Sequence, residues 1–222
     1  MALLVALVGC ATDSTTAPAS SAAAPSPPAT TASALVPLSS DALLTAGQVP
    51  AWNGMMGWVE QQLPPGVSAV TVCVLPSAES LGALQVLTRD FEAAGVEDPG
   101  ITPNPEDPTS YAVNEVAQFP DEAAAVAAVR AWEDATRDCA PGFSSTNLQS
   151  FRISDLPTGS TWTAAASELR AECPECMRFD FLGFASKGAA TTMVGFSLTG
   201  QDANYDDDPL AESMDAALAR LP

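Results

Sequence analysis

Apolar and polar residues alternate in several segments of the chain, and this alternation predicts a sheet. Successive side chains of a strand point to opposite faces, so a strand with one buried face alternates in hydropathy. The segments with this pattern, or with a strand-like density of aromatic and β-branched residues, are 70–75, 84–91, 111–119, 148–153, 162–169, 177–184 and 191–198. The last two flank Ser186-Lys187-Gly188, which predicts a hairpin.

Two segments follow the period of a helix instead. Residues 121–139 begin with Asp121 and Glu122, whose negative charge is favoured on the first turn by the helix dipole. At helical spacing, one face of this segment carries Val126, Val129, Trp132, Thr136 and Cys139. A second helix is predicted to begin at Asp208-Pro209, an N-cap followed by proline at the first helical position. Its buried side is formed by Leu210, Met214, Ala217, Leu218 and Leu221.

These elements predict an α+β fold class, a twisted and mostly antiparallel sheet of about six or seven strands with a central and a C-terminal helix. The links between strands are too short for parallel crossovers, except across the helix 121–139. The domain is expected to begin near Ser40-Asp41, a capping pair before a short helical stretch at Ala42-Leu43-Leu44. We expect the helices on one side of the sheet, an arrangement that tends to leave a concavity.

Residues 1–9 are a short apolar segment followed by Cys10. The segment is too short to span a bilayer, which takes about 20 residues, and it is typical of the apolar part of a signal peptide. Leu7-Val8-Gly9-Cys10 resembles the bacterial lipobox, which implies that the thiol of Cys10 receives a diacylglyceryl group and that Cys10 becomes the first mature residue. No Lys or Arg precedes Cys10, so either the true start lies upstream or the motif is a coincidence.

Residues 10–39 are expected to form a disordered tether. They are rich in Ala, Ser, Thr and Pro, they contain no aromatic residue, and Asp13 is their only charge, so they offer little that could form a core. Anchor, tether and then a globular domain at 40–222 is the usual order of a surface lipoprotein. We therefore expect a lipid anchor that holds the protein at the extracytoplasmic face of the cell membrane.

The excess of acidic residues limits the partners that the protein is expected to bind. The chain has 27 acidic against 8 basic residues, a net charge of −19, which would be repelled by phosphate backbones. We expect no nucleic-acid partner, and a neutral or cationic ligand rather than an anionic one. The chain has no histidine, which removes Ser-His-Asp and Cys-His catalysis and imidazole zinc sites. We expect no enzymatic activity, no cofactor and no metal.

An enzymatic alternative rests on Glu115 and Asp180, two strand carboxylates that could form a glycosidase pair. The more ordinary interpretation is that they form ion pairs across strands with the available arginines, which are Arg89, Arg152 and Arg178. A Ser-Lys mechanism would need Ser186 and Lys187. We discount it, because adjacent residues on a tight turn rarely aim two side chains at one substrate atom.

Four further cysteines lie in the body of the chain. In an exported protein, structural disulfides are the plain interpretation of Cys73, Cys139, Cys173 and Cys176. Of the three possible pairings we prefer Cys73–Cys139 and Cys173–Cys176. Zinc and redox roles for Cys173-Pro174-Glu175-Cys176 are less favoured, because strand-like segments lie on both sides and there is no histidine ligand.

Two other segments are candidate binding sites. Residues 52–58 place Trp52 and Trp58 among glycines and methionines. These side chains could hold a sugar, a lipid or a partner. The favoured interpretation is that they pack the N-terminal segment on the sheet. The acidic residues of 202–208 offer oxygen ligands for calcium, and a solvated loop that ends in a helix cap explains them without a metal.

The domain also resembles a known family. Residues 40–222 are similar to the PknH-type extracellular sensor domain of mycobacterial receptor kinases, which also occurs in free-standing actinobacterial lipoproteins. The segments and residues that carry the resemblance are Asp41-Ala42-Leu43-Leu44, Cys73, Ala117-Gln118-Phe119-Pro120-Asp121, Trp132 and Cys139. The resemblance implies a twisted antiparallel sheet with flanking helices, two disulfides and a cleft suspected of binding a ligand. We expect a ligand-binding or sensing domain; a structural or partner-binding lipoprotein and a lipid carrier remain the alternatives.

Overall fold

The computed structural model describes residues 35–50, 57–62, 74–94, 110–139, 148–156, 159–167, 177–200 and 209–222. The strands are β1 (Gly57–Glu60), β2 (Gln85–Ala94), β3 (Ser110–Gln118), β4 (Leu148–Leu156), β5 (Gly159–Ser167), β6 (Met177–Lys187) and β7 (Ala190–Gly200). The helices are α1 (Glu122–Cys139) and α2 (Pro209–Arg220), preceded by two 3-10 turns, η1 (Ser40–Ala42) and η2 (Ala46–Gln48).

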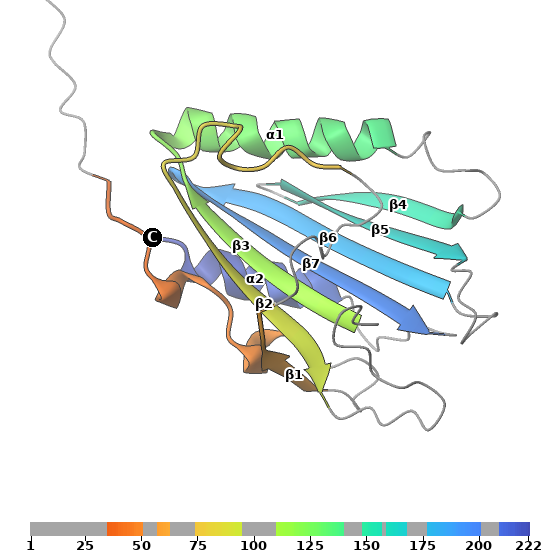
Figure 1. Cartoon of the computed structure of the whole chain (residues 1–222). Helices are drawn as coiled ribbons and strands as arrows, with labels where there is room; N and C mark the ends of the chain where they lie inside the picture. Colours follow the sequence, from red (N-terminus) through yellow and green to blue (C-terminus); the bar gives the residue numbers. More distant parts are fainter. Residues whose placement is uncertain are drawn as a thin grey trace, which may run out of the picture. The chain divides into compact units, whose positions relative to one another are not determined.

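The strands form one seven-stranded sheet in the order β1-β2-β3-β7-β6-β5-β4, and every neighbouring pair is antiparallel (Figure 1). Two meanders, β1 to β3 and β4 to β7, meet at the pair β3–β7 in the middle of the sheet. Helix α1 carries the chain from the central β3 to the edge strand β4, which runs in the same direction as β3. The predicted α+β class and the single crossover through the helix are therefore confirmed.

The two helices lie on opposite faces of the sheet. Phe184 of β6 is opposite Met193 of β7, and both pack in a cluster with Trp132 of α1. Val194, the next residue of β7, points to the other face and packs with Leu210 of α2. We call these faces the α1 face and the α2 face. The expectation that the helices lie on one side is wrong, because β6 carries apolar side chains on both faces, Leu182 and Phe184 on one and Phe179 and Phe181 on the other, and each of these faces needs a cover.

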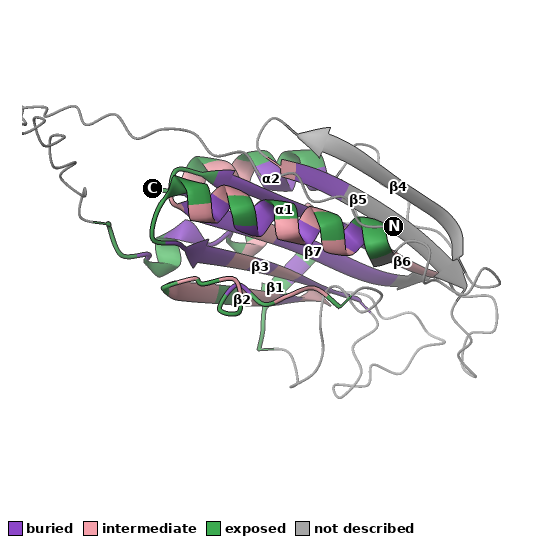
Figure 2. Cartoon of the chain, turned by 90° about the horizontal axis from the view of Figure 1, so that it is seen from above, coloured by how far each residue is buried: buried purple, intermediate pink, exposed green. Residues whose placement is uncertain are grey.

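The α2 face is a continuous apolar core. Its buried members include Leu44, Val49, Trp58, Phe91, Ala112, Val194, Phe196, Leu198, Leu210, Met214 and Ala217. Helix α2 approaches β6 closely at Gly183, where an added Cβ would lie 2.7 Å from both Cγ and Sδ of Met214. The buried residues of each helix recur at helical spacing, as the periodicity predicts, and Figure 2 shows buried, intermediate and exposed residues interleaved along α1.

On the α1 face the apolar core gathers around Trp132. Its ring lies 6.2 Å from that of Phe184, and its indole Nε1 donates a 2.8 Å hydrogen bond to the carbonyl oxygen of Pro76. This bond ties the segment before β2 to α1. Asp121 caps the helix, because its Oδ1 accepts a 2.8 Å hydrogen bond from the N–H of Ala124.

Three predictions about local elements are corrected. Of the predicted strand 70–75, residues 70–73 lie outside the described residues, and Val74 and Leu75 belong to no strand. The first strand is β1, whose four residues are too few to show an alternating pattern. The helical stretch at Ala42-Leu43-Leu44 covers only Ala42, as the end of η1, because Leu43 is already extended.

Residues 1–34 lie outside the described residues, so the signal peptide, the lipobox and most of the tether stay predictions. Residues 35–222 form one compact unit. In the described ranges, no helix is long and apolar enough to cross a membrane.

Candidate functional site

The α1 face of the central strands carries a row of polar side chains. Tyr111 of β3 is opposite Ser197 of β7, and Ser197 is opposite Asp180 of β6. Residues opposite one another share a face, so these three side chains lie side by side across three strands. Arg178 lies two residues before Asp180 on β6 and therefore points to the same face.

These four residues form a connected hydrogen-bond network, which we call the Arg178 network. The Nε of Arg178 donates to both carboxylate oxygens of Asp180, at 2.9 and 3.2 Å. Its Nη2 donates to the hydroxyl of Tyr111, at 2.9 Å, and to Oγ of Ser197. Ser197 in turn donates a 2.8 Å hydrogen bond to Oδ1 of Asp180. Each of these side chains therefore fixes the orientation of its neighbours.

The charges of the network follow from its burial. The side chain of Asp180 is 2% exposed and that of Arg178 is 21% exposed. Burial raises the pKa of Tyr111 above its ordinary value, although Arg178 opposes this, so the phenol is neutral at physiological pH. Burial is the largest single influence on Arg178 and works against its charge, but the charge interactions and hydrogen bonds with Asp180 and Tyr111 together outweigh it and raise the pKa of the guanidinium. The network therefore contains a permanent ion pair.

One nitrogen of the Arg178 guanidinium, Nη1, takes no part in these hydrogen bonds. Among the residues that the structure describes, Nη1 of Arg178 has no hydrogen-bond partner. The side chain is partly exposed, and its N–H groups are fixed in direction by the bonds to Asp180 and Tyr111. A fixed N–H donor beside a neutral phenol can hold a hydroxyl or carbonyl oxygen of a ligand.

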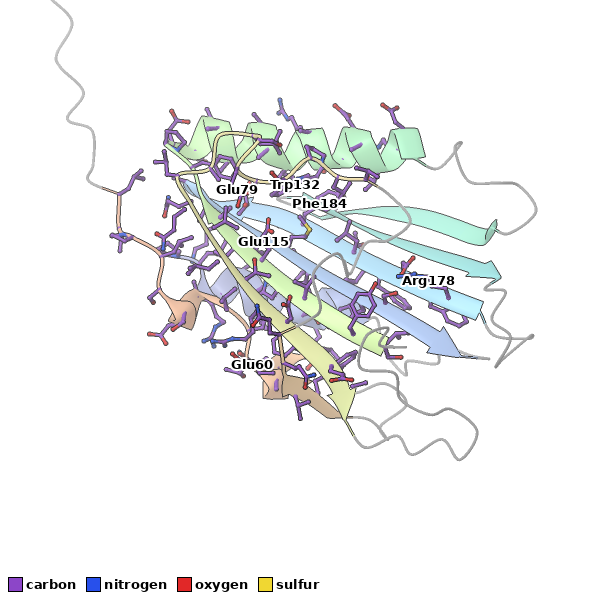
Figure 3. The ribbon with its side chains drawn as sticks, in the orientation of Figure 1. Glu60, Glu79, Glu115, Trp132, Arg178 and Phe184 are labelled. Atoms are coloured by element: carbon purple, nitrogen blue, oxygen red, sulfur yellow. The ribbon has the colours of Figure 1, made fainter. Side chains whose placement is uncertain are left out.

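A second polar group lies on the same face, four residues further along β3. Glu115 is opposite Thr88 of β2 and Met193 of β7, and in the described part of the chain its carboxylate has neither a hydrogen bond nor an ion pair. Burial raises its pKa to about 7, and the like charge of Glu79 contributes. Figure 3 shows Glu79 and Glu115 near Trp132, and Arg178 further along the strands.

The structure separates the predicted carboxylate pair. Glu115 and Asp180 share the α1 face, but they are two strands and four residue positions apart. Strand spacing and rise put them about 17 Å apart, whereas glycosidase carboxylates are about 5–9.5 Å apart. Asp180 forms an ion pair with one of the three expected arginines, Arg178, but the two residues lie on the same strand, β6, and not on neighbouring strands.

The other two arginines do not complete the expected pairs. Arg89 lies on the α2 face, where its Nε is 3.2 Å from Oε1 of Glu60 and its Nη1 donates to the carbonyl oxygen of Leu44. Arg89 is therefore no partner for Glu115. The side chain of Arg152 lies outside the described residues.

The two tryptophan candidates have different outcomes. Trp58 is buried in the α2 core, its ring lies 6.1 Å from that of Phe196, and its Nε1 donates a 2.7 Å hydrogen bond to the carbonyl oxygen of Pro50. This is the packing role, with the indole N–H already used. Trp52 lies outside the described residues.

Most of the remaining candidates fall outside the described residues. These are Cys73, Cys173, Cys176, the side chain of Cys139, and residues 202–208, so the disulfide pairing and the calcium alternative stay predictions. Across the described residues, no group of three or more acidic or cysteine side chains could hold a metal ion. Ser186 is buried, whereas Nζ of Lys187 donates to the carbonyl oxygen of Leu221, so the two side chains do not converge.

Sequence reasoning named Arg178 as an available ion-pair partner of Asp180, but it missed Tyr111 and Ser197. The only local signal was an Arg and an Asp two residues apart on one strand, which places both on one face. Tyr111 and Ser197 are 67 and 19 residues from Arg178 in sequence. Only the pairing of β3, β7 and β6 brings them together.

Comparison with solved structures gives a structural likeness. The sequence matches no protein-family model and no curated protein. Among solved structures, the crystal structure of the extracellular domain of PknH from Mycobacterium tuberculosis is similar, with 14% sequence identity and a TM-score of 0.49 over 82% of this chain and 93% of that chain. At this identity and TM-score the likeness is coarse, so the function of this chain has to be argued from its own side chains.

Proposed function

We propose that residues 35–222 form an extracytoplasmic ligand-binding or sensing domain, and that the ligand contacts the Arg178 network. The observation that carries this proposal is a partly exposed arginine whose Nη1 has no hydrogen-bond partner among the described residues, and whose other donors are fixed by Asp180, Tyr111 and Ser197. A buried ion pair is seldom the most stable filling for a sheet surface, because desolvation offsets its attraction. Groups fixed in advance are what a binding site needs.

The charge on this face favours a neutral or cationic ligand. Asp90 and Glu92 of β2 lie opposite Val113 and Tyr111 and therefore share the α1 face with Asp180. In the described strands, Arg178 is the only basic residue on that face, and it is already paired. An anion would meet more carboxylates than basic groups on these strands, whereas a hydroxyl-bearing neutral molecule would meet donors and acceptors.

The binding proposal is tested by native mass spectrometry of the full chain, purified gently from its own host. We expect a small polar adduct that is lost in Arg178→Lys and weakened in Tyr111→Phe, because each variant removes a directed donor and leaves the fold. Glu60→Gln, on the exposed edge of the α2 face, is the control and should keep the adduct. A bare mass in every sample, with a protein partner found by crosslinking, would favour the structural role, and a co-purified lipid would favour the carrier.

We further propose that Cys10 is lipidated and holds the domain at the extracytoplasmic face of the cell membrane. The support is the lipobox-like Leu7-Val8-Gly9-Cys10 and the Ala/Ser/Thr/Pro-rich residues that follow it. Expression with the upstream region in an actinobacterial host should give membrane-bound protein, and Cys10→Ala should release it to the medium. A Cys10→Ala variant that stays in the membrane fraction would contradict the anchor.

The cysteine pairing is open to a direct test. We propose the disulfides Cys73–Cys139 and Cys173–Cys176, which suit an exported chain. Peptide mapping without reductant should recover these two crosslinked peptides. A crossed pairing, or four free thiols, would show that the proposal is wrong.

A further inference from the structure

The segment before β1, residues 35–50, is bound to the α2 face as a peptide ligand would be. Gln85, at the start of β2, contacts the main chain of Leu38 at both of its polar groups. Its Oε1 accepts from the N–H of Leu38 at 3.0 Å, and its Nε2 donates to the carbonyl oxygen of the same residue at 3.0 Å. One amide side chain therefore satisfies a whole backbone unit, as a neighbouring strand would.

Leu44 is held in the same way by two side chains. Its N–H donates to Oδ1 of Asn114 at 2.8 Å, and its carbonyl oxygen accepts from Nη1 of Arg89 at 2.8 Å. Asn114 is fully buried, and its Nδ2 donates at 3.0 Å to Oγ1 of Thr192 and to the carbonyl oxygen of Met193, which fixes the orientation of its amide. Gln85, Arg89 and Asn114 all point to the α2 face.

Between these contacts, apolar side chains of the segment fill the surface. Leu38 and Leu43 are buried with Val116, Ala190 and Leu221, near the end of α2. Leu44 is fully buried in the core of the α2 face. At the end of the segment, Nη1 of Arg220 donates a 3.0 Å hydrogen bond to Oε1 of Gln48.

We infer that the α2 face is a peptide-binding surface that recognises the main chain of a short apolar segment, and that residues 35–50, with their two 3-10 turns, occupy it in cis and can bind it in trans. Peptide-recognition surfaces combine hydrogen bonds to the main chain, which give affinity, with pockets for a few side chains, which give specificity. The ligand class is an apolar peptide with anchors spaced as Leu38, Leu43 and Leu44. In the intact chain, covalent linkage keeps the effective concentration of the segment high.

The test uses the full chain with a protease site inserted between residues 50 and 57, cleaved after folding. The fragment that ends at the cut should stay bound through gel filtration and should be displaced by a fluorescent peptide of residues 35–50. Gln85→Ala together with Asn114→Ala should speed this exchange at least about tenfold, because hydrogen bonds to the peptide backbone are lost. Gln61→Ala, an exposed residue of the same type, is the matched control.

Specificity is tested by the peptide itself. A peptide with Leu44→Asp should not exchange, because a carboxylate would enter a fully buried position. Three results would each overturn the inference. The fragment could leave a body that stays folded, or its exchange rate could be unchanged by the substitutions at Gln85 and Asn114. The cleaved chain could also unfold in a way that excess peptide does not reverse.

Discussion

The two faces of one sheet differ in how they use polar side chains. On the α2 face, Gln85, Arg89 and Asn114 bind backbone groups of the chain's own N-terminal segment. On the α1 face, Arg178 and its partners bind one another, and Nη1 of Arg178 has no hydrogen-bond partner among the described residues. The first arrangement closes a core, whereas the second leaves a prearranged group for another molecule.

The same strands supply both faces, because their side chains alternate. In β6, Phe179 and Phe181 face α2, whereas Arg178 and Asp180 face the other way. In this part of the strand the α2 face is therefore apolar and the α1 face polar, whereas Leu182 and Phe184 further along pack in the core of the α1 face. Substitutions of the apolar core and of the polar groups should consequently differ in their effects.

The largest expected effect is on the α2 face. Phe196→Ala removes a fully buried ring that packs against Trp58, and should lower the free energy of unfolding by about 3–5 kcal/mol, measured by urea denaturation. The control Val59→Ala, at a side chain that is 45% exposed, should cost less than about 0.5 kcal/mol. Equal effects at the two positions would mean that the α2 face is not a packed core.

The next effect concerns ion pairs on the two faces. Asp180→Ala leaves the guanidinium of Arg178 without its countercharge, and should cost about 2–3 kcal/mol because that side chain is mostly buried. Glu60→Ala breaks the pair with Arg89 on the α2 face, but Glu60 is 61% exposed and the loss should be below about 1 kcal/mol. Arg178→Met with Asp180→Leu should recover most of the lost stability. A double variant as unstable as Asp180→Ala would contradict this account.

The third prediction concerns the pH dependence of the free energy of unfolding, which involves Glu115 on the α1 face. The pKa of Glu115 is raised from 4.5 to about 7 in the folded chain, so the proton is held more tightly there than in the unfolded chain. This contribution to stability is complete below about pH 4.5 and is lost as the pH rises through about 7. Glu115→Gln stays neutral, so it should be more stable than the native chain at pH 8 by about 3 kcal/mol and similar to it at pH 4.

The measurement for Glu115 is a series of urea denaturations between pH 4 and pH 8. Glu79→Gln should flatten the pH dependence only in part, because Glu79 is the smaller cause of the shift. Glu122→Gln, on the exposed first turn of α1, is the control and should leave the dependence unchanged. A native chain whose stability rises between pH 5 and pH 8 would refute the assignment.

The smallest effect tests the packing of α2 on β6. Gly183→Ala should lower the free energy of unfolding by about 1–2 kcal/mol, because the new methyl group would meet the flexible side chain of Met214. In a Met214→Ala background the same change should cost less, and thermal unfolding of the four chains gives the coupling. Independent, additive effects would show that the contact is not formed.

The sequence alone determined most of the secondary structure, because its signals are local. The apolar spacing of residues 121–139 and the first-turn proline at Pro209 predicted α1 and α2 within a residue. Alternation located β3, β6 and β7, and the turn between the last two, since the pleat imposes its period on each strand separately. β1 was missed because four residues hold too little pattern.

The tertiary structure decided the face on which each element lies and which side chains meet. The order of strands places β7 between β3 and β6, and this alone joins Tyr111, Ser197 and Arg178, which no spacing in the sequence relates. The raised pKa of Glu115 likewise depends on burial and on Glu79, which comes from a separate segment. Strand pairing depends on contacts between residues that are far apart in sequence. Local patterns therefore specify where the strands are, but not which strands become neighbours.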